Sequence, residues 1–441
     1  MNIGESRKET IAMVRGYGIA GAILAGAVCF GAQADDKVTF TKDVLPILQE
    51  NCVKCHRPGG DNISGMVAPM SLMTYEEVRP WAKAVAKAVT DKKMPPWFTT
   101  PQFHGIFENE RVLTNEQIKT IATWVESGAT RGNPQDAPAA VQFDDHGGWL
   151  TGTPDLVVKM PKPHFVADEI EDVYVNFMTD PLTEEQLPKD RWLRAIEWRG
   201  GSEVVHHIVG GASMKDENGE QLYYELGSIA PGEEGMLFPE GHGKLLPKGS
   251  KIHFQMHYHK EPGPGTGTWD QSMVSFRFWD EEKDPKIQFA MARSGISNHT
   301  FEIPPNHGSW PVGAAITFDV DTTIHALHPH MHLRGKDARY IAYYPDGTKE
   351  ELLWVPGFDF NWQLDYTYAE PKKVPAGTRV EFTAHYDNSP DNIYNPDPSI
   401  SMAWGGPTTM EMMIGYIAYC NTEPSDNPMP AARKATGEGT D

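Results

Sequence analysis

The stretch KIHFQMHYH (residues 251–259) decides how the larger part of this chain is interpreted. Its three histidines and Gln255 occupy every second position, and mostly apolar residues stand between them. Since successive side chains on a β-strand point to opposite faces, this alternation predicts a strand with the polar residues on one face. Short runs of this kind, separated by Gly and Pro turns, continue from residue 150 to 422. We therefore expect this part to be all-β, built as two sandwich domains.

Two further groups of histidines point to metal binding. His206-His207 is an adjacent pair, and His328, His330 and His332 recur at every second position. His330 and His332 would share one face of a strand, so both can reach a single ion. The members of the adjacent pair point to opposite faces of a regular strand, so they can bind together only at a bulge or a strand end. Three histidine groups in one chain favour a metal site over isolated polar residues.

The other donors in the sequence favour copper. No Cys and no carboxylate at facial-triad spacing joins the histidine groups, whereas the Met-rich stretch 409–416 offers a thioether. Imidazole together with thioether suits copper that cycles through Cu(I). Cys420 is the one thiol outside the N-terminal third, and it lacks the His-x-x-x-Met context of a blue-copper carrier. A catalytic copper is the expectation.

The motif Cys52-Val53-Lys54-Cys55-His56 is the C-x-x-C-H pattern of covalent haem c attachment. The two thiols would add to the haem vinyl groups, and His56 would be the proximal iron ligand. We expect Met94 to be the second axial ligand. Its alternatives are Met66, Met70 and Met73. Helix patterns around the motif predict a small helical domain over residues 37–132 that resembles a class I cytochrome c, followed by a linker over 133–149.

The start of the chain has the features of a secretory signal peptide over residues 1–34. A basic region precedes the uncharged stretch 16–30, and Ala32-Gln33-Ala34 resembles a cleavage site. We expect a periplasmic or secreted protein with no membrane span after cleavage, and an uncleaved anchor is the alternative.

Charge and composition add two expectations. The 60 acidic and 39 basic residues give a net charge of −21, which disfavours a nucleic-acid partner. The 41 Gly and 35 Pro residues favour a turn-rich, largely β chain. The polar tail over 423–441 is expected to be disordered.

The order of the motifs carries a resemblance. His-His, Gln-x-His-Tyr, His-x-His-x-x-Gly-Lys and Glu-Met with an aromatic residue four positions later follow one another across residues 200–420. This order resembles the copper type II ascorbate-dependent monooxygenases, the family of peptidylglycine α-hydroxylating and dopamine β-monooxygenases. The resemblance implies two jelly-roll sandwich domains, here 150–290 and 291–422, with one copper each and a solvent-filled cleft between them. The expected fold class is a small all-α cytochrome c domain followed by two all-β jelly-roll sandwich domains.

The same resemblance implies roles for individual residues. Two coppers are implied, one for electron transfer and one for oxygen activation, with the ligand sets His206, His207 and His257, and His330, His332 and Met412. Gln255 matches a family residue near the first site, and Tyr416 matches an aromatic hydroxyl in the substrate pocket. Met410 and Met413 are the rival thioethers to Met412.

The chain also departs from the family. Peptide-hydroxylating members have an Arg where this chain has His328 and an Asn where it has Ile414. A glycine-extended peptide is therefore not the expected substrate. The disulfide framework of the family is absent as well. Five histidines have no family role, and hydrogen bonding to ligand residues and a third metal both stay open for them: His253, His259, His325, His328 and His385.

These features together predict an exported haem- and copper-dependent monooxygenase, with one covalent haem c and two coppers. It would hydroxylate a C–H bond of a small molecule or a modified peptide with O2, and a periplasmic donor would supply electrons through the haem. The alternative is a non-catalytic periplasmic electron-transfer or copper-binding protein. A weaker alternative is peroxidase-like activity at an open haem.

Overall fold

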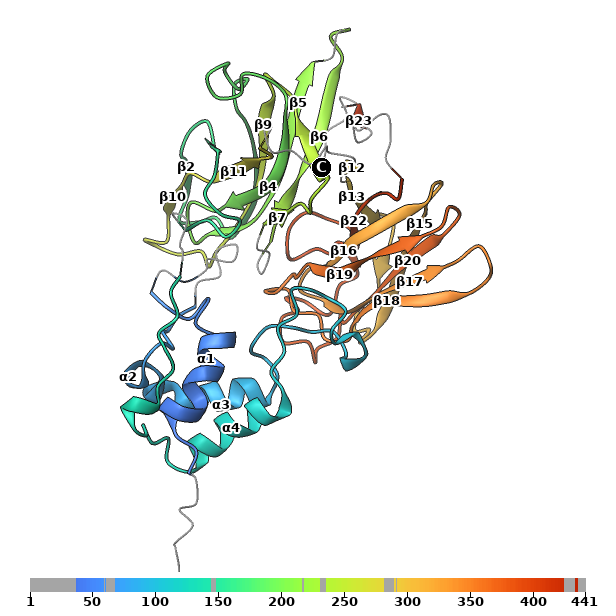
Figure 1. Ribbon diagram of the computed structural model, residues 1–441. Coiled ribbons are helices and arrows are strands. Elements are labelled where there is room, and N and C mark those ends of the chain that lie inside the picture. Colours follow the sequence, from blue (N-terminus) through green and yellow to red (C-terminus); the bar gives the residue numbers. More distant parts are fainter. Residues whose placement is uncertain are drawn as a thin grey trace, which may run out of the picture. The chain divides into compact units, whose positions relative to one another are not determined.

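A computed structural model gives the fold of this chain (Figure 1). It describes residues 37–58, 60, 68–143, 148–215, 218–230, 235–280, 289–290, 292–423 and 433–434. The expected signal peptide and the alternative haem ligand Met66 lie outside the described residues. Within the described ranges, no helix has both the length and the apolar character needed to cross a membrane.

The first β region, residues 150–290, contains strands β1 to β12. They are β1 Leu156–Lys159, β2 His164–Val166, β3 Asp172–Met178, β4 Arg191–Arg199, β5 Val205–Lys215, β6 Gln221–Ile229, β7 Met236–Leu237, β8 His242–Leu246, β9 Lys251–His259, β10 Thr268–Asp270, β11 Met273–Phe278 and β12 Phe289–Ala290. One sheet has the order β1-β11-β4-β8-β12 with β7 paired to β4, and the other has the order β23-β6-β5-β9-β3. Trp198 of β4 and Phe254 of β9 meet edge to face with ring centroids 5.2 Å apart, so side chains of both sheets share one core.

The second β region, residues 292–422, contains strands β13 to β22. They are β13 Ala292–Ser297, β14 Glu302–Ile303, β15 Trp310–Thr317, β16 Thr322–His330, β17 Gly335–Tyr343, β18 Lys349–Val355, β19 Tyr366–Val374, β20 Arg379–Tyr386, β21 Met402–Ala403 and β22 Ile414–Asn421. The sheets β13-β22-β16-β19 and β15-β20-β17-β18 again bury a common core. Gly415 of β22 is needed there, because a Cβ at this position would collide with the Phe382 ring of β20.

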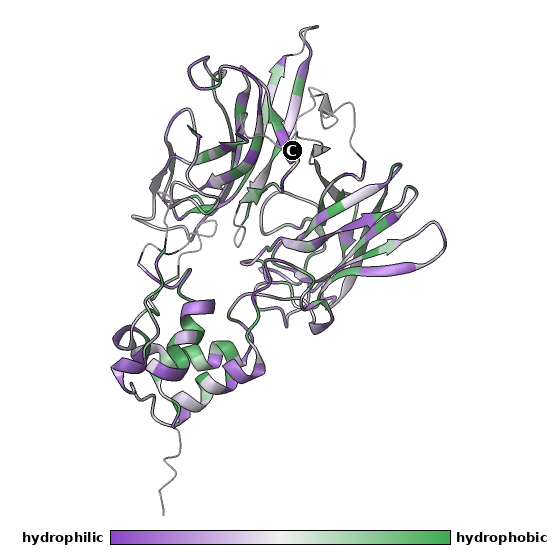
Figure 2. Ribbon diagram, viewed as in Figure 1, coloured by the Kyte–Doolittle hydropathy of each residue, from purple (hydrophilic) through white to green (hydrophobic). Residues whose placement is uncertain are grey.

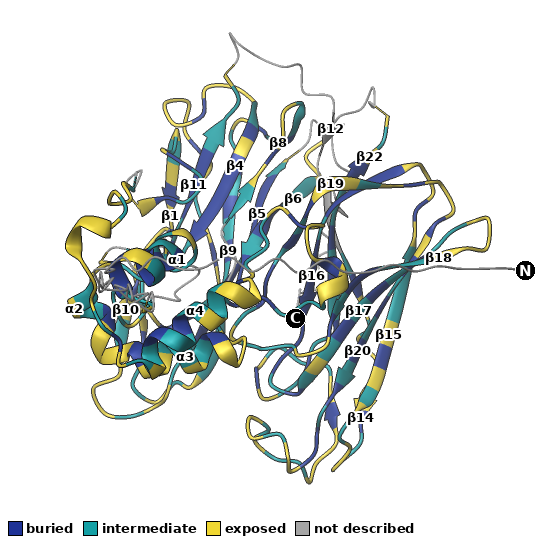
Figure 3. Cartoon of the chain, turned by 60° about the horizontal axis from the view of Figure 1, so that its bottom comes forward, coloured by how far each residue is buried: buried dark blue, intermediate teal, exposed yellow. Residues whose placement is uncertain are grey.

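Alternating side chains explain why these segments are strands. Strand β20 alternates between buried and more exposed residues along most of its length, with Val380, Phe382, Ala384 and Tyr386 turned into the core. Apolar and polar residues alternate along many strands in Figure 2, and Figure 3 shows the strands mostly in the buried and intermediate colours. Antiparallel strands with one face in a core and one face more exposed are expected to show this pattern.

Helices occupy the start of the described chain. The α-helices are α1 Leu45–Asn51, α2 Tyr75–Val78, α3 Ala82–Thr90 and α4 Asn115–Glu126, and short π or 3-10 turns lie at Phe40–Val44, Arg79–Trp81, Pro101–Phe103 and Pro134–Asp136. The side chain of Thr114 accepts a hydrogen bond from the Gln117 amide at the start of α4, and the Gln117 side chain accepts one in return from the Thr114 amide. Phe40, Leu48 and Trp124 are buried together in a small helical core.

The expected fold class, a small all-α cytochrome c domain followed by two all-β jelly-roll sandwich domains, is wrong. The chain is mostly β, with 38% strand against 13% helix, so the helices form a minor part of it. Val38–Asp441 forms one compact unit, so the helices do not separate from the β regions as a domain.

The physical reason lies in the segment after α3. Trp97, Phe103 and Phe107 were assigned to the helical domain, but they are buried in the core of the second β region. The amide of Ala369 donates to the Ile106 carbonyl across 2.9 Å, which adds this segment to the edge of β19. The aromatic residues expected to complete a helical core therefore complete a β core, and the remaining helices are short.

The passage between the two β regions and the end of the chain are the remaining parts of the fold. Strand β12 pairs with β8 of the first β region and β13 pairs with β22 of the second, so the chain passes from one region to the other between these strands. Arg433–Lys434 forms β23 and pairs with β6, and the expected disorder of the tail stays a prediction. The other tail residues beyond Glu423 lie outside the described ones.

Candidate metal centre

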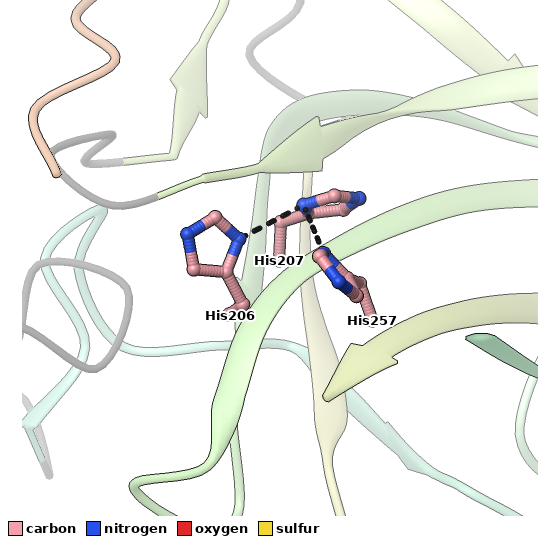
Figure 4. Close-up of side chains that lie close together, drawn as sticks. All are labelled: His206, His207 and His257. Carbon is pink, nitrogen blue, oxygen red and sulfur yellow. Dashed lines mark hydrogen bonds between the residues drawn. The ribbon is translucent and has the colours of Figure 1, made fainter. Parts of the chain in front are cut away.

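His206, His207 and His257 meet at the junction of β5 and β9 (Figure 4). The Nδ1 atom of His207 lies 3.3 Å from Nδ1 of His206 and 3.1 Å from Nδ1 of His257. The register of β5 against β9 shifts between Val205 and His207, so His206 is the extra residue of a bulge. This is the irregularity that an adjacent pair of ligands requires, and it allows three ring nitrogens to face one point.

Asp172 of β3 fixes the orientation of His257. Nε2 of His257 lies 3.0 Å from Asp172 Oδ1, so the ring donates its Nε2 proton to the carboxylate and leaves a lone pair on Nδ1. Burial raises the pKa of Asp172, but hydrogen bonds from His257 and His259 outweigh burial and hold this pKa well below its usual range. A carboxylate that hydrogen-bonds a histidine in this way is the usual support of a metal ligand.

Strand β3 also ties this site to the second β region. The Thr408 hydroxyl donates to Asp172 Oδ2 across 2.7 Å, and the Tyr174 hydroxyl donates to the Gly406 carbonyl across 2.7 Å. The Tyr174 ring stacks on His257, with centroids 4.2 Å apart and planes 7° apart. Asp172 and Tyr174 therefore connect His257 to the loop that leads into Met412.

His330 and His332 form the second part of the site, at the end of β16. Their ring centroids are 5.3 Å apart. Nδ1 of His330 donates to Gln363 Oε1 across 2.5 Å, and Nδ1 of His332 donates to the Met410 carbonyl across 3.2 Å. In both rings this bonding leaves the lone pair on Nε2, so Nε2 is the atom available to an ion.

The two histidine sets adjoin each other. The rings of His207 and His330 are 6.1 Å apart, centroid to centroid. Phe360 stacks on His206 at 4.5 Å and meets His332 edge to face at 5.9 Å. The five histidines therefore form one continuous group, which we call the central histidine cluster: His206, His207, His257, His330 and His332.

The thioether candidates differ in where they lie. Met413 is fully buried in the core of the second β region, and the Met410 sulfur packs against Gly405. Met412 is half-buried. Pairing of His330 with Ile414 places residue 412 opposite residue 332 if the ladder is continued by two residues. Because the ladder ends at the His330–Ile414 pair, the choice of Met412 over Met410 and Met413 stays a prediction.

Glu411 binds the backbone next to His332, at the end of β16. It is fully buried, and its carboxylate accepts hydrogen bonds from the backbone amides of His332, at 2.9 Å, and Arg334, at 2.7 Å. Burial raises the pKa of Glu411 to about 8, although these amides and the Arg334 charge oppose the rise. The turn after β16 is therefore held against the segment before β22 that contains Met412.

The other predicted site residues lie nearby with different relations to the cluster. Tyr416 pairs with His328 across the β16–β22 ladder, and its ring is 6.4 Å from His330. Gln255 lies two residues before His257 on β9, in register with Val209 and Asn176. Four of the histidines without a family role have polar partners of their own. Those pairs are His253 with Ser213, His259 with Asp172, His328 with Asp365 and His385 with Asp337.

Electrostatics keep the central histidine cluster neutral. Burial and the neighbouring rings lower the pKa of His206, His207 and His330 well below the usual value, and burial lowers that of His332 to about 4. Nε2 of His206 and Nε2 of His332 are buried and have no hydrogen-bond partner among the described residues. Neutral imidazoles with buried, unpartnered nitrogens are the form that binds a metal ion.

The C-x-x-C-H motif lies at the end of α1. Cys52 follows the helix directly, and both Cys52 and Cys55 are half-buried. Nδ1 of His56 donates to the Met70 carbonyl across 3.2 Å, which leaves the lone pair on Nε2. Met94 is half-buried in the loop after α3. The structure leaves haem ligation by His56 and Met94 a prediction.

Several residues of the site were missed in the sequence. Asp172, Tyr174, Phe360 and Gln363 all contact cluster histidines, yet none lies in a histidine motif. Asp172 and Tyr174 stand two apart on one strand and so share a face, which is a usable signal once β3 is known to pair with β9. Phe360 and Gln363 lie in an irregular segment before β19, and no periodicity identifies them.

Comparisons with known proteins do not identify the chain. No family model and no curated protein matches it. Similar solved structures include the empty particles of cowpea mosaic virus (5% identity, covering 65% of this chain and 96% of that chain, TM-score 0.28) and the major capsid protein P2 of bacteriophage PM2 (9%, 60% and 99%, 0.23). The VP2 subviral particle of infectious bursal disease virus matches at 10% identity over 66% and 77%, with a TM-score of 0.19. At these TM-scores and identities, the likeness supports no conclusion about this chain.

Proposed function

We propose that the central histidine cluster holds two copper ions, and that the protein is an oxidoreductase that uses O2 to hydroxylate a C–H bond. The observation that carries this proposal is the convergence of the Nδ1 atoms of His206, His207 and His257, with the His330–His332 pair directly beside them. The resemblance to the copper type II monooxygenases leads to the same two ligand sets.

The donor set fits copper. The ligand atoms are imidazole nitrogens, and the nearest carboxylate, Asp172, is engaged with the far nitrogen of His257 and with Thr408. The buried, unpartnered Nε2 atom of His332 gains a partner when an ion binds. Imidazoles joined by the soft thioether of Met412 suit an ion that alternates between Cu(II) and Cu(I).

The overall reaction balances when two electrons are supplied. The substrate C–H bond, O2, two electrons and two protons give an alcohol and water. Bound copper supplies one-electron redox chemistry and an O2 binding site. Cys52 and Cys55 would hold a haem c, His56 and Met94 would be its ligands, and the haem would supply one-electron transfer from a periplasmic donor.

The chain's own residues orient the site and keep it dry. Asp172 and Gln363 fix the ring orientation of His257 and His330 by hydrogen bonds. Phe360 covers His206 and borders His332, so it excludes water between the two sets. Tyr416, whose ring lies beside His330, is the hydroxyl closest to the place where a substrate would meet the oxygen-activating set. Gln255 would support the first set from the same face of β9.

Metal analysis and O2 uptake test the proposal together. We expect purified protein to carry one haem and two coppers per chain, and to consume O2 catalytically when a reductant and a substrate are present. His207→Ala should lose copper and O2 uptake. His253→Asn, on the same strand β9 but bonded to Ser213, should keep both. Copper at background level in the wild-type protein, or O2 uptake that survives His207→Ala, contradicts the proposal.

Burial of the cluster favours one alternative, a copper-binding or electron-transfer protein without oxygenase activity. His207, His257, His330 and His332 are all buried, and a carrier needs no room for a substrate. Such a protein would bind the same copper but consume O2 only up to the amount of its reduced metal. The O2 measurement therefore separates the two functions.

A further inference from the structure

His242, His325 and Cys420 form a second group of metal-type side chains, which we call the thiol cluster. Their ligand atoms all lie within 4.8 Å of one another. His325 and Cys420 are buried, and His242 is half-buried. The thiol cluster shares no residue with the central histidine cluster, and neither the resemblance nor the proposed function uses it.

A bulge in β16 directs His325 to this place. The pairing of β16 with β22 passes from Ile324–Tyr419 to Ala326–Ala418, and the pairing with β19 shifts at the same point. His325 is therefore the extra residue against β22, whereas against β19 the longer stretch, residues 368–371, lies on β19. Its Nε2 atom lies 3.4 Å from the Cys420 sulfur of β22. A bulge in the interior of a sheet is a feature that re-aims one side chain, here toward a thiol.

His242 reaches the group from the first β region. Its Nδ1 donates to the Glu240 carbonyl across 2.9 Å, so Nε2 carries the lone pair. The Trp279 indole donates to the His242 carbonyl across 2.8 Å, which fixes the backbone at the start of β8. The ring centroids of His242 and His325 are 5.0 Å apart. These bonds fix the position of His242, whose ring lies beside that of His325.

The chemistry of the three donors is specific. Two imidazoles and one thiolate form an N2S set, and thiolate and imidazole together select copper and zinc among common metal ions. Burial raises the pKa of the Cys420 thiol to about 12, so without metal the thiol stays protonated. Binding of an ion would replace this proton, as at other thiolate sites.

We propose that His242, His325 and Cys420 bind one first-row transition-metal ion of the class that includes copper and zinc. The ion would join β8 of the first β region to β16 and β22 of the second. Its role would be structural, because it links β8 of one sheet to the paired strands β16 and β22 of another sheet. This proposal does not depend on the proposed oxygenase function.

Cobalt(II) titration of the full-length protein tests the thiol cluster. We expect the difference spectrum, metal-loaded minus metal-free, to show a thiolate-to-cobalt charge-transfer band in the near ultraviolet, since a bound haem cancels in the difference. Cys420→Ser should abolish this band. His207→Ala, which removes one ligand of the first histidine set, and Cys52→Ser/Cys55→Ser, which removes the other described thiols, should keep it.

A second variant and a second measurement distinguish loss of the metal site from misfolding of Cys420→Ser. His242→Asn changes a half-buried residue at the start of a strand and should lose the band while keeping the fold, as judged by circular dichroism. Cobalt bound at the thiol cluster should also raise the unfolding temperature of His207→Ala but not of the same variant combined with His242→Asn. Absence of the band in wild-type protein, or its persistence in Cys420→Ser or His242→Asn, overturns the proposal.

Discussion

The central histidine cluster and the thiol cluster are built by the same device with different donors. In each, a bulge lets a histidine turn toward ligands on a neighbouring strand, His206 in β5 and His325 in β16. Asp172 and Gln363 hydrogen-bond ligand rings of the central histidine cluster, whereas the thiol cluster contains a thiol and has the Glu240 carbonyl bonded to His242. The comparison teaches that two histidine groups of similar construction differ in the groups that hydrogen-bond their rings.

We expect the largest effect on metal binding from a variant that lacks two ligands of the first histidine set. We expect His207→Ala/His257→Ala to lose metal binding at the first histidine set completely, because one remaining imidazole cannot hold the ion. The thiol cluster should keep its cobalt band, since it shares no ligand with this set. Metal content by mass spectrometry and the cobalt difference spectrum measure the two outcomes on one sample. Parallel loss at both clusters would mean that they do not bind independently.

Loss of the Asp172 carboxylate should weaken copper binding measurably, but less than loss of two ligands does. We expect Asp172→Asn to weaken copper binding at the first set by about 10- to 100-fold, because the amide polarises the His257 ring less than a carboxylate does. Competition with a chelator of known affinity measures the change. Asp168→Asn is the matched control, because Asp168 bonds the backbone amides of Gly265 and Gly267 and contacts no cluster histidine. Equal weakening in both variants would contradict the assigned role of Asp172.

The sequence predicts one cluster far better than the other, and the reason is spacing. His206-His207 and His330-x-His332 are visible because their ligands lie within three residues, and strand alternation then says which ones share a face. His242, His325 and Cys420 stand alone in the sequence, and only the arrangement of β8, β16 and β22 brings them together. A local sequence pattern therefore reveals a site only where ligands that bind one ion also lie close together in the sequence.

The fold shows the same limit. Strands such as β9 and β20 follow from alternation, and the cap at Thr114 marks the start of α4. The error lay in the segment around Phe107, whose aromatic residues suit a helical core as well as a β core. Composition cannot say which core receives them, because burial of an aromatic ring stabilises either one by a similar amount. Pairing of this segment with β19 decided the question, and pairing between distant segments is not encoded in local pattern.

We expect the smallest effect from loss of the hydrogen bond between Tyr174 of β3 and the Gly406 carbonyl. Tyr174→Phe removes the hydrogen bond to the Gly406 carbonyl but keeps the ring stacked on His257. We expect the free energy of unfolding to fall by about 1 kcal/mol, the usual worth of one hydrogen bond, with little change in copper affinity. Urea unfolding of the metal-free protein and chelator competition measure the two quantities. If the copper affinity fell as far as in Asp172→Asn, the Tyr174 hydroxyl would matter as much as the Asp172 carboxylate for holding His257 in place. The separate roles assigned to Asp172, which orients His257, and to Tyr174, which links β3 to Gly406, would then be wrong.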